Sequence, residues 1–195
     1  MERLLVATNN AGKAKEIKAI LGNVYDEIIT FKDAGIVLDV VEDGDSFEEN
    51  AVKKAREAAF LSGCDALADD SGLCVDALGG APGIRSARYA GESATDAQNN
   101  EKLLRELKNM KDRSARFVCV VALVKGETLT TAQGEIKGEI AQHASGSGGF
   151  GYDPLFFVTE YGQTFAQLPA DIKNSISHRA QALDSLKKKL TRERI

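Results

Sequence analysis

The sequence of 195 residues has few of the side chains that cross-link secreted proteins or bind zinc. Its three cysteines, Cys64, Cys74 and Cys119, are odd in number, widely spaced and without a C-x-x-C pair, which argues against disulfides and a zinc site. Cys119 lies within the apolar run FVCVVALV, as expected for a small core residue. Only two histidines, His143 and His178, are present, so a bound metal ion would depend on oxygen ligands.

Long apolar runs and an excess of positive charge are also missing. The N-terminal apolar run from Leu4 to Ala7 is too short for a signal peptide, and no stretch approaches the length of a membrane span. With 29 acidic and 25 basic residues the net charge is -4, so no global positive field would hold a nucleic-acid polymer or an anionic membrane. We therefore expect a soluble, cytoplasmic protein whose anionic ligands are small molecules.

The composition is typical of one globular domain. Hydrophobic residues make up 43% of the chain and charged residues 28%, and the chain is long enough to bury a sizeable core. It contains no repeats, linkers or low-complexity segments, so we expect a single domain over residues 1–195. Short apolar runs alternate with helical patterns, which predicts an α/β fold with a mixed sheet flanked by helices.

Caps and apolar spacing predict the individual elements. Strands are expected at 3–8, 66–68 and 73–78, then a hairpin over 114–140, with a loop over 79–91. Helices are expected at 13–21, between the Ser46/Glu49 capping box and Gly63, after Thr95, and from Ser175 or Ser177 onward. The predicted buried positions of the last two helices are Leu103, Leu104, Leu107 and Met110, and Ala180, Leu183, Leu186 and Leu190.

The segment T-N-N-A-G-K, Thr8 to Lys13, lies where the first strand passes into a helix. A helix N-terminus carries N–H groups and a positive dipole end that stabilise a phosphate, and Lys13 adds a full charge. A Walker A loop is excluded, because Ala7 and Ala14 stand where that motif needs glycine and Ser/Thr. A helix capped by asparagine with an exposed lysine would explain the segment about as well.

Two adjacent carboxylates, Asp69 and Asp70, follow the apolar run 66–68. Such a pair is costly without a cation, and Glu42 lies in another acidic turn. Oxygen ligands from separate segments favour Mg²⁺, which takes one or two carboxylates plus substrate phosphate, as Glu42 and Asp70 could supply. Asp69 and Asp70 should point in different directions, so that only one faces the metal. A plain Asp-Ser-Gly surface turn is the alternative.

Two further segments could bind a ligand. SGSGGFGYDP combines glycines, which allow close approach of the backbone, with Phe150 and Tyr152, which offer a stacking face; a flexible hairpin end would explain only the glycines. Lys173, His178 and Arg179 cluster around the start of the last helix, where positive side chains are mildly unfavourable. This favours an anionic or carbonyl-rich ligand, although a solvated helix face is the commoner explanation.

Six segments in a fixed order span almost the whole chain: T-N-N-x-G-K at 8–13, F-x-E-N-A-x-x-K-A at 47–55, A-D-D-S-G-L at 68–73, L-G-G-x-P-G-x-x-S-A-R at 78–88, G-G-F-G-Y-D-P at 148–154 and S-H-R at 177–179. Together they resemble the inosine triphosphate pyrophosphatase family, which hydrolyses non-standard purine triphosphates. The resemblance implies a long mixed sheet with two lobes and a central cleft, a homodimer, and a Mg²⁺-dependent conversion of ITP, dITP or XTP to the nucleoside monophosphate and pyrophosphate.

The resemblance also implies a role for each residue of the site. Phosphates would be held by Thr8, Asn9, Asn10 and Lys13, with help from Lys54. Mg²⁺ would be bound by Glu42 and Asp70, Asp70 would also accept the proton of the attacking water, and Ser71 would touch the substrate. Asp69 would lie behind the metal ligands or share the metal. Phe150 would stack on the base, Gly151, Tyr152 and Asp153 would complete its wall, and Lys173, His178 and Arg179 would read its polar edge.

The residue chemistry is consistent with this activity. Phosphoryl transfer needs an in-line water and charge neutralisation, which Mg²⁺, Lys13 and a carboxylate could supply without a covalent nucleophile. Hypoxanthine and xanthine carry an oxygen that satisfies donors such as Arg179 or Lys173, whereas adenine would leave them unpaired. Two alternatives stay open: a related phosphatase or pyrophosphatase with other substrates, and a nucleotide-sensing module without catalysis.

Overall fold

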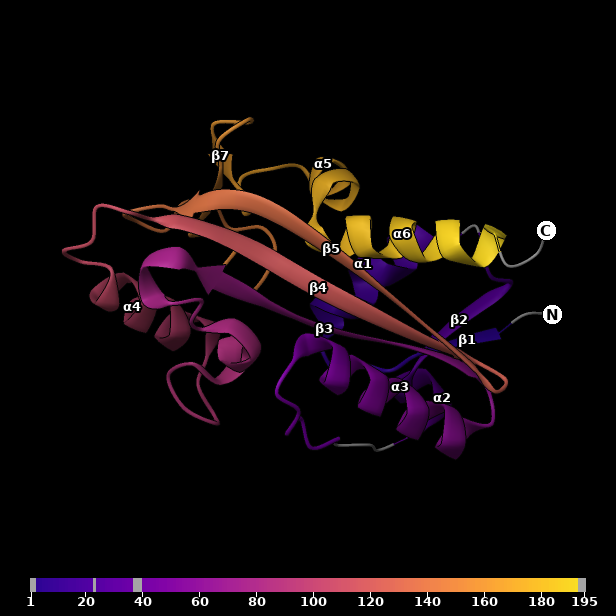
Figure 1. Cartoon of the computed structure of the whole chain (residues 1–195). Coiled ribbons are helices and arrows are strands. Elements are labelled where there is room, and N and C mark those ends of the chain that lie inside the picture. The colour runs from indigo at the N-terminus through magenta and orange to yellow at the C-terminus, as the bar shows by residue number, and fades with distance from the viewer. Residues whose placement is uncertain (1–2, 23, 37–39, 193–195) are drawn as a thin grey trace. The chain divides into compact units, whose positions relative to one another are not determined.

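The computed structural model describes residues 3–22, 24–36 and 40–192 (Figure 1). Within these ranges the strands form a seven-stranded sheet in the order β2-β1-β3-β4-β5-β6-β7. Their bounds are β1 Arg3–Val6, β2 Glu27–Thr30, β3 Asp65–Val75, β4 Ser114–Lys125, β5 Thr128–Ile140, β6 Phe156–Val158 and β7 Gln163–Thr164. β1 pairs in parallel with β2 and β3, whereas β6 pairs antiparallel with β5 and β7, so the predicted mixed sheet is confirmed.

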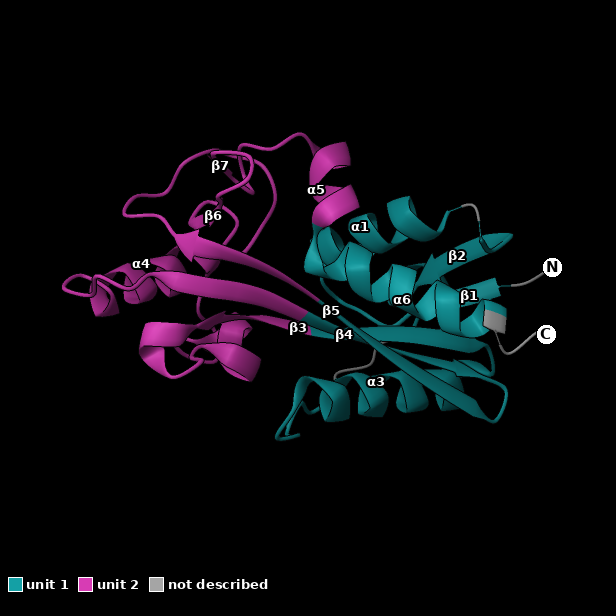
Figure 2. Cartoon of the chain, turned by 45° about the horizontal axis from the view of Figure 1, so that its top comes forward, with its two compact units in different colours: residues 1–70, 119–134, 177–195 teal, residues 71–118, 135–176 magenta. Residues whose placement is uncertain are grey.

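The α-helices of the described ranges are α1 Ala11–Leu21, α2 Phe31–Ala34, α3 Phe47–Ser62, α4 Asp96–Glu106, α5 Ala170–Ile176 and α6 His178–Arg192, with 3₁₀ turns at Asp76–Leu78 and Gly83–Arg88. The described residues contain no helix long and apolar enough to cross a membrane. The residues fall into two compact units (Figure 2): unit 1 comprises 1–70, 119–134 and 177–195, and unit 2 comprises 71–118 and 135–176. Strands β3, β4 and β5 contribute residues to both units.

Unit 1 is a sheet with helices on both faces (Figures 1 and 2). Because strand side chains alternate, Leu4 and Val6 pack on one face with residues of α1 and α6, while Leu5 and Ala7 pack on the other with Ala51 and other residues of α3. β4 follows the same rule, since its residues 119, 121 and 123 belong to the first cluster and 120 and 122 to the second. The alternation fixes which side chains of β3 face which helix.

Unit 2 has its own apolar core. β3, β4 and α4 contribute buried side chains to it, among them Leu73 and Leu103. At its centre the rings of Phe117, Phe156 and Phe165 lie with centroids 4.7–5.9 Å apart. Aromatic contacts of this spacing add to the stabilisation from burial. Tyr152 and Leu155, from the segment that precedes β6, contribute to this core.

Most predicted helix signals are confirmed, with local corrections. The Ser46 hydroxyl accepts from the N–H of Glu49 and Gly63 ends α3 in the left-handed conformation, but the Glu49 carboxylate accepts from Asp45 rather than from the cap residue. The first helix begins at Ala11, before the predicted start. Met110 was predicted to be buried and is 43% exposed, because α4 ends at Glu106 and Met110 lies outside it.

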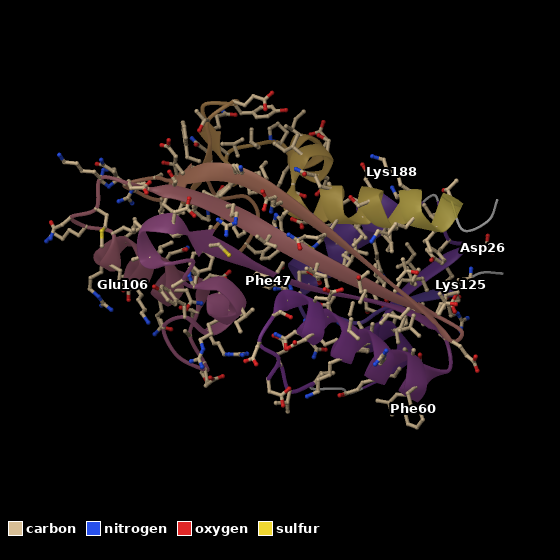
Figure 3. The ribbon with its side chains drawn as sticks, viewed as in Figure 1. Asp26, Phe47, Phe60, Glu106, Lys125 and Lys188 are labelled. Carbon is tan, nitrogen blue, oxygen red and sulfur yellow. The ribbon has the colours of Figure 1, made fainter. Side chains whose placement is uncertain are left out.

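Other differences concern short or acidic segments. The predicted strands 66–68 and 73–78 are one strand, β3, which runs through the acidic pair without a turn. The predicted loop 79–91 contains the 3₁₀ turn Gly83–Arg88. The last helix, α6, begins at His178 as predicted, and its buried positions Ala180, Leu183 and Leu186 are confirmed; the short helix α5 before it was not predicted. Figure 3 shows Lys188 on the opposite, outward side of α6, and Phe60 projecting from α3, where it is 88% exposed.

Candidate active site

The two adjacent aspartates of β3 are buried, Asp69 at 1% and Asp70 at 4% exposure, so the alternative of a surface turn is wrong. As successive residues of a strand they point to opposite faces of the sheet, as the sequence predicts. Their partners differ accordingly: Asp69 contacts Lys13 and Arg179, whereas Asp70 contacts Asn50 and Lys54. One strand thus supplies two carboxylates with different surroundings.

Asp69 is the counter-ion of two cations. Its Oδ2 lies 3.2 Å from Lys13 Nζ on α1 and 2.9 Å from Arg179 Nη2 on α6. Arg179 also pairs with Glu16, one turn after Lys13 on α1. Burial by itself would raise the pKa of Asp69, but the charges of Lys13, Arg179 and Lys54 outweigh burial and hold that pKa well below its usual range. Asp69 is therefore a fixed negative charge.

Asp70 has a different electrostatic environment. Its Oδ2 accepts from Asn50 Nδ2 at 3.1 Å, and its Oδ1 lies 3.6 Å from Lys54 Nζ. Burial raises the pKa of Asp70, and the nearby Glu42 carboxylate adds to this, although Lys54 and Lys13 oppose it. A buried carboxylate whose pKa is raised binds a proton more readily than an exposed one, which suits a general base.

Lys54 joins Asp70 to the acidic turn before α3. Its Nζ lies 2.8 Å from Glu42 Oε1, and its side chain is 12% exposed. Burial lowers the pKa of Lys54, but the charges of Asp70, Asp69 and Glu42 outweigh burial and raise that pKa. One ammonium group therefore lies within 2.8–3.6 Å of an oxygen from each of two carboxylates.

The start of α1 is held by the side chains that precede it. Thr8 Oγ1 accepts from the N–H of Asn10 at 3.1 Å, and Asn10 Oδ1 accepts from the N–H of Lys13 at 3.0 Å, which makes Asn10 the N-cap. Asn9 is exposed between them. The alternative of an exposed lysine is wrong, because the Lys13 side chain is 16% exposed and paired with Asp69.

A close approach of two backbones fixes Arg179. A Cβ added at Gly134 of β5 would lie 2.3 Å from the Ala182 nitrogen and 2.4 Å from the His178 oxygen, so only glycine lets α6 come this close. The Ser177 hydroxyl accepts from the N–H of Ala180 in the first turn of α6. His178 and Arg179 are 5% and 1% exposed, so neither is an exposed first-turn residue.

The residues fit a sparsely ligated Mg²⁺ better than a closed metal site. Among the described ranges, no three His, Cys, Asp or Glu side chains are arranged to hold a metal ion. The carboxylates of Glu42 and Asp70, however, are hard oxygen donors drawn to one cation, the Lys54 ammonium group. Mg²⁺ takes one or two carboxylates and completes its coordination with water and substrate phosphate, so this donor set fits.

The candidate base-binding residues lie in unit 2, in a segment we call the Phe150 loop, residues 149–153. Asp153 Oδ2 accepts from the N–H of Phe150 at 2.8 Å and from Lys173 Nζ at 2.5 Å. Lys173 lies 4.9 Å from the centroid of the half-buried Phe150 ring, a cation–π distance. Tyr152 is buried and its hydroxyl donates to the Ser86 oxygen at 2.8 Å. These contacts order the segment, so the alternative of a flexible hairpin end does not account for it.

The structure brings many of the predicted site residues into contact within each unit. In unit 1, Lys13 meets Asp69, and Glu42 meets Asp70 through Lys54. In unit 2, Lys173 and Asp153 meet Phe150, while Ser71 follows Asp70 directly in β3. The predicted base contacts of His178 and Arg179 stay predictions; in the structure Arg179 pairs with the carboxylates of Glu16 and Asp69.

Two charged or polar partners were not foreseen from the sequence. Glu16 is 8% exposed and pairs with Arg179; the available signal was its position three residues after Lys13 on one helix face. Asn50 is 1% exposed, bonds Asp70, and accepts from the N–H of Gly44 at 2.9 Å. Its signal was an amide on the apolar, alanine-rich face of α3.

The fold is that of an α/β protein with a mixed sheet, and the interior strand β3 carries a buried acid pair neutralised by lysine and arginine, a candidate centre for a metal ion and an anion. The sequence matches the family model described as the Ham1 family over residues 4–189, and the chain belongs to this family.

Its similarity to named proteins extends over nearly the whole chain. It is 54% identical to the dITP/XTP pyrophosphatase of Clostridium perfringens, covering 97% of this chain and 98% of that protein. It is 52% identical to the dITP/XTP pyrophosphatase of Geobacter sulfurreducens, covering 96% of each. The solved structure of a HAM1 protein from Coxiella burnetii matches with a TM-score of 0.87 and 43% identity, covering 98% of this chain and all of that one.

Proposed function

We propose that this chain is a Mg²⁺-dependent nucleoside-triphosphate pyrophosphatase that hydrolyses the non-canonical purine nucleotides ITP, dITP and XTP to the monophosphate and pyrophosphate. The observation that carries the proposal is the pair on β3, in which Asp69 is neutralised by cations while burial raises the pKa of Asp70. The names of the relatives at 52–54% identity support the same substrate class. Such an enzyme would act in the cytoplasm as a homodimer and remove these nucleotides from the pool.

In this proposal unit 1 handles the phosphates. Thr8, Asn9, Asn10 and Lys13 bind them at the start of α1, with Lys54 as a further cation. Glu42 and Asp70 would hold Mg²⁺, and the bound ion would neutralise charge on the triphosphate. Asp70 accepts the proton of the attacking water, and Ser71, the next residue of β3, touches the substrate. Asp69 keeps the ammonium group of Lys13 in place.

In this proposal the stacking residue, the wall and Lys173 come from unit 2, and two further base contacts, His178 and Arg179, come from unit 1. The Phe150 ring stacks on the purine, and Gly151, Tyr152 and Asp153 complete the wall. Lys173 donates to the oxygen that replaces the amino group of adenine, together with His178 and Arg179 as the sequence predicts. Because adenine would leave such donors unpaired, ATP should be a poor substrate.

Pyrophosphate release from ITP, dITP, XTP, GTP and ATP, with and without Mg²⁺, tests the proposal. We expect release from the first three only with Mg²⁺. Asp70→Asn removes the proton acceptor and should lower kcat at least about 10²-fold, in the range of general-base catalysis. Asp112→Asn, an exposed aspartate in unit 2, is the matched control and should keep full activity. Release from ATP or GTP but from none of the other three nucleotides would identify a related hydrolase. Binding of nucleotide without release of pyrophosphate would identify a nucleotide sensor. Either result would contradict the proposal.

A further inference from the structure

The Phe150 loop is hydrogen-bonded to the first two turns of α4. The N–H of Gly151 donates to Asp96 Oδ2 at 2.7 Å, and Asn100 Nδ2 donates to the Gly151 oxygen at 3.0 Å. Asp96 and Asn100 are four residues apart in α4 and therefore lie on one face of the helix. Both polar groups of the Gly151 backbone are thus bound by side chains of α4.

These bonds act on the backbone on both sides of Phe150. Its own N–H donates to Asp153 Oδ2 at 2.8 Å, and the following N–H, that of Gly151, donates to Asp96. The residues on either side are Gly149 with φ 74° and Gly151 with φ 60°, in the left-handed region. Glycines in such positions sample many conformations unless other contacts restrict them. The two carboxylates therefore restrict the backbone from which the Phe150 side chain projects.

The Asp153 carboxylate is closely surrounded by the backbone of the Phe150 loop. A Cβ added at Gly149 would lie 2.0 Å from Asp153 Oδ2, so the loop closes tightly around that carboxylate. Asp153 is in turn held by Lys173, whose Nζ lies over the Phe150 ring. The Asp96 carboxylate has no such enclosure, since Asp96 is exposed and reaches the loop from a separate helix.

A capping function does not account for Asp96. The start of α4 is capped by Thr95, whose hydroxyl accepts from the N–H of Gln98 while the Gln98 side chain accepts from the N–H of Thr95. An acid in the first turn also interacts with the helix dipole, but that requires no particular direction of the carboxylate. The Asp96 carboxylate is directed at Gly151, at a distance typical of a charge-assisted hydrogen bond.

We propose that Asp96, assisted by Asn100, is a positioning residue that orients Phe150 for stacking on the base. The proposal rests on the proposed function insofar as Phe150 contacts a purine. It predicts an effect on nucleotide binding rather than on the hydrolytic step, because Asp96 bonds the Phe150 loop within unit 2, whereas the proposed proton acceptor Asp70 belongs to unit 1.

Steady-state kinetics with ITP tests the role in binding. Asp96→Ala should raise KM at least about 10-fold, the lower end of the loss expected for one hydrogen bond to a charged group because Asp96 is exposed, with kcat within about twofold. Asp96→Asn keeps an acceptor oxygen for the Gly151 N–H and should restore most of the affinity. Asn100→Ala should raise KM to a smaller extent. Glu101→Ala, an exposed acid on the same helix, is the control and should leave KM unchanged.

A second measurement does not depend on catalysis. The sequence contains no tryptophan, so Phe150→Trp places a single indole in the loop. In this background, without nucleotide, Asp96→Ala should lower the steady-state fluorescence anisotropy, whereas Asp96→Asn and Glu101→Ala should not; far-UV circular dichroism checks the fold of each variant. If Asp96→Ala fails to fold, Asn100→Ala gives the same comparison.

The two measurements separate the hypotheses. If no nucleotide is hydrolysed, the proposed function fails, while the anisotropy still reports on the loop. Unchanged anisotropy in Asp96→Ala would overturn the positioning role, as would lowered anisotropy with an unchanged KM. A KM raised equally by Asp96→Ala and Asp96→Asn would assign the effect to the helix dipole and would also overturn it.

Discussion

At the scale of single residues, the candidate site contains a network of ion pairs that is largely buried. Lys13, Asp69, Arg179 and Glu16 form a chain of alternating charges in unit 1, and the Asp69 and Arg179 side chains are 0–1% exposed. The charge of Asp69 raises the pKa of Arg179 further, against the effect of its burial. Burial and, to a smaller extent, the Asp69 charge raise the pKa of the neighbouring Cys119 thiol to about 12, so Cys119 stays neutral. The site is therefore organised around fixed charges.

Asp69→Asn should be strongly destabilising. It leaves the buried Arg179 and the mostly buried Lys13 with Glu16 as the one carboxylate of this four-residue charge network, and removing one partner of a buried ion pair costs about 3–5 kcal/mol. Asp76→Asn is the matched control, because its pair with Arg116 has side chains 39–51% exposed and should contribute no more than about 1 kcal/mol. Urea denaturation at neutral pH measures both. Equal losses in the two variants would contradict a special role for the buried network.

At the scale of the elements, the sequence predicts those helix and strand boundaries that depend on neighbouring residues alone. Ser46 and Gly63 bound α3 as expected, because caps depend on neighbouring backbone groups. Local patterns predict two strands with the acidic pair between them, and a surface turn only as the alternative. The continuation of β3 through the pair depends on its neutralisation by Lys13, Arg179 and Lys54, which come from three other elements. β2, β6, β7 and α2 have two to four residues each, too few to show a periodicity.

The same contrast applies to the candidate site. Motif order sufficed to nominate Lys13, Asp70 and Phe150, because each lies in a segment with its own composition. The partners Glu16, Asn50 and Asp96 lie in ordinary helices, and only tertiary contacts show what their side chains bind. The proposed ligand-binding residues are thus easier to recognise in a single sequence than the residues that hold their side chains or backbone in place.

At the junction of β5 and α6, Gly134→Ala tests whether helix placement controls the site. The new Cβ would collide with backbone atoms of Ala182 and His178, and overpacking of this kind costs about 1–3 kcal/mol. We expect lower stability together with slower pyrophosphate release, because the shift of α6 moves Arg179 away from Asp69. Gln133→Ala, an exposed neighbour on β5, should change neither quantity. A Gly134→Ala variant with reduced stability and full activity would show that Arg179 placement is not limiting.

At the scale of the whole molecule, the chain passes repeatedly between the two units within continuous strands. β3, β4 and β5 each cross from one set of residues to the other without an intervening linker. Each unit nevertheless has an apolar cluster of its own. Independent domains are normally joined by flexible linkers, whereas these two units are joined by continuous strands. We therefore expect the chain to unfold in one cooperative transition, as for the single domain that the sequence predicts.

Ligand binding should shift that transition as a whole. A ligand that binds only the native state stabilises it by about 2.7 kcal/mol at 100 times its Kd, and for a chain of this size that corresponds to roughly 5–10 °C in Tm. We therefore expect Mg²⁺ with an α,β-imido analogue of ITP to raise a single calorimetric Tm by this amount. The matching ATP analogue should give a much smaller shift, because the base donors stay unpaired, and Asp70→Asn should abolish the part of the shift that requires Mg²⁺. Two transitions, of which one responds to ligand, would show that the units unfold separately, and equal shifts with both analogues would contradict selection at the base.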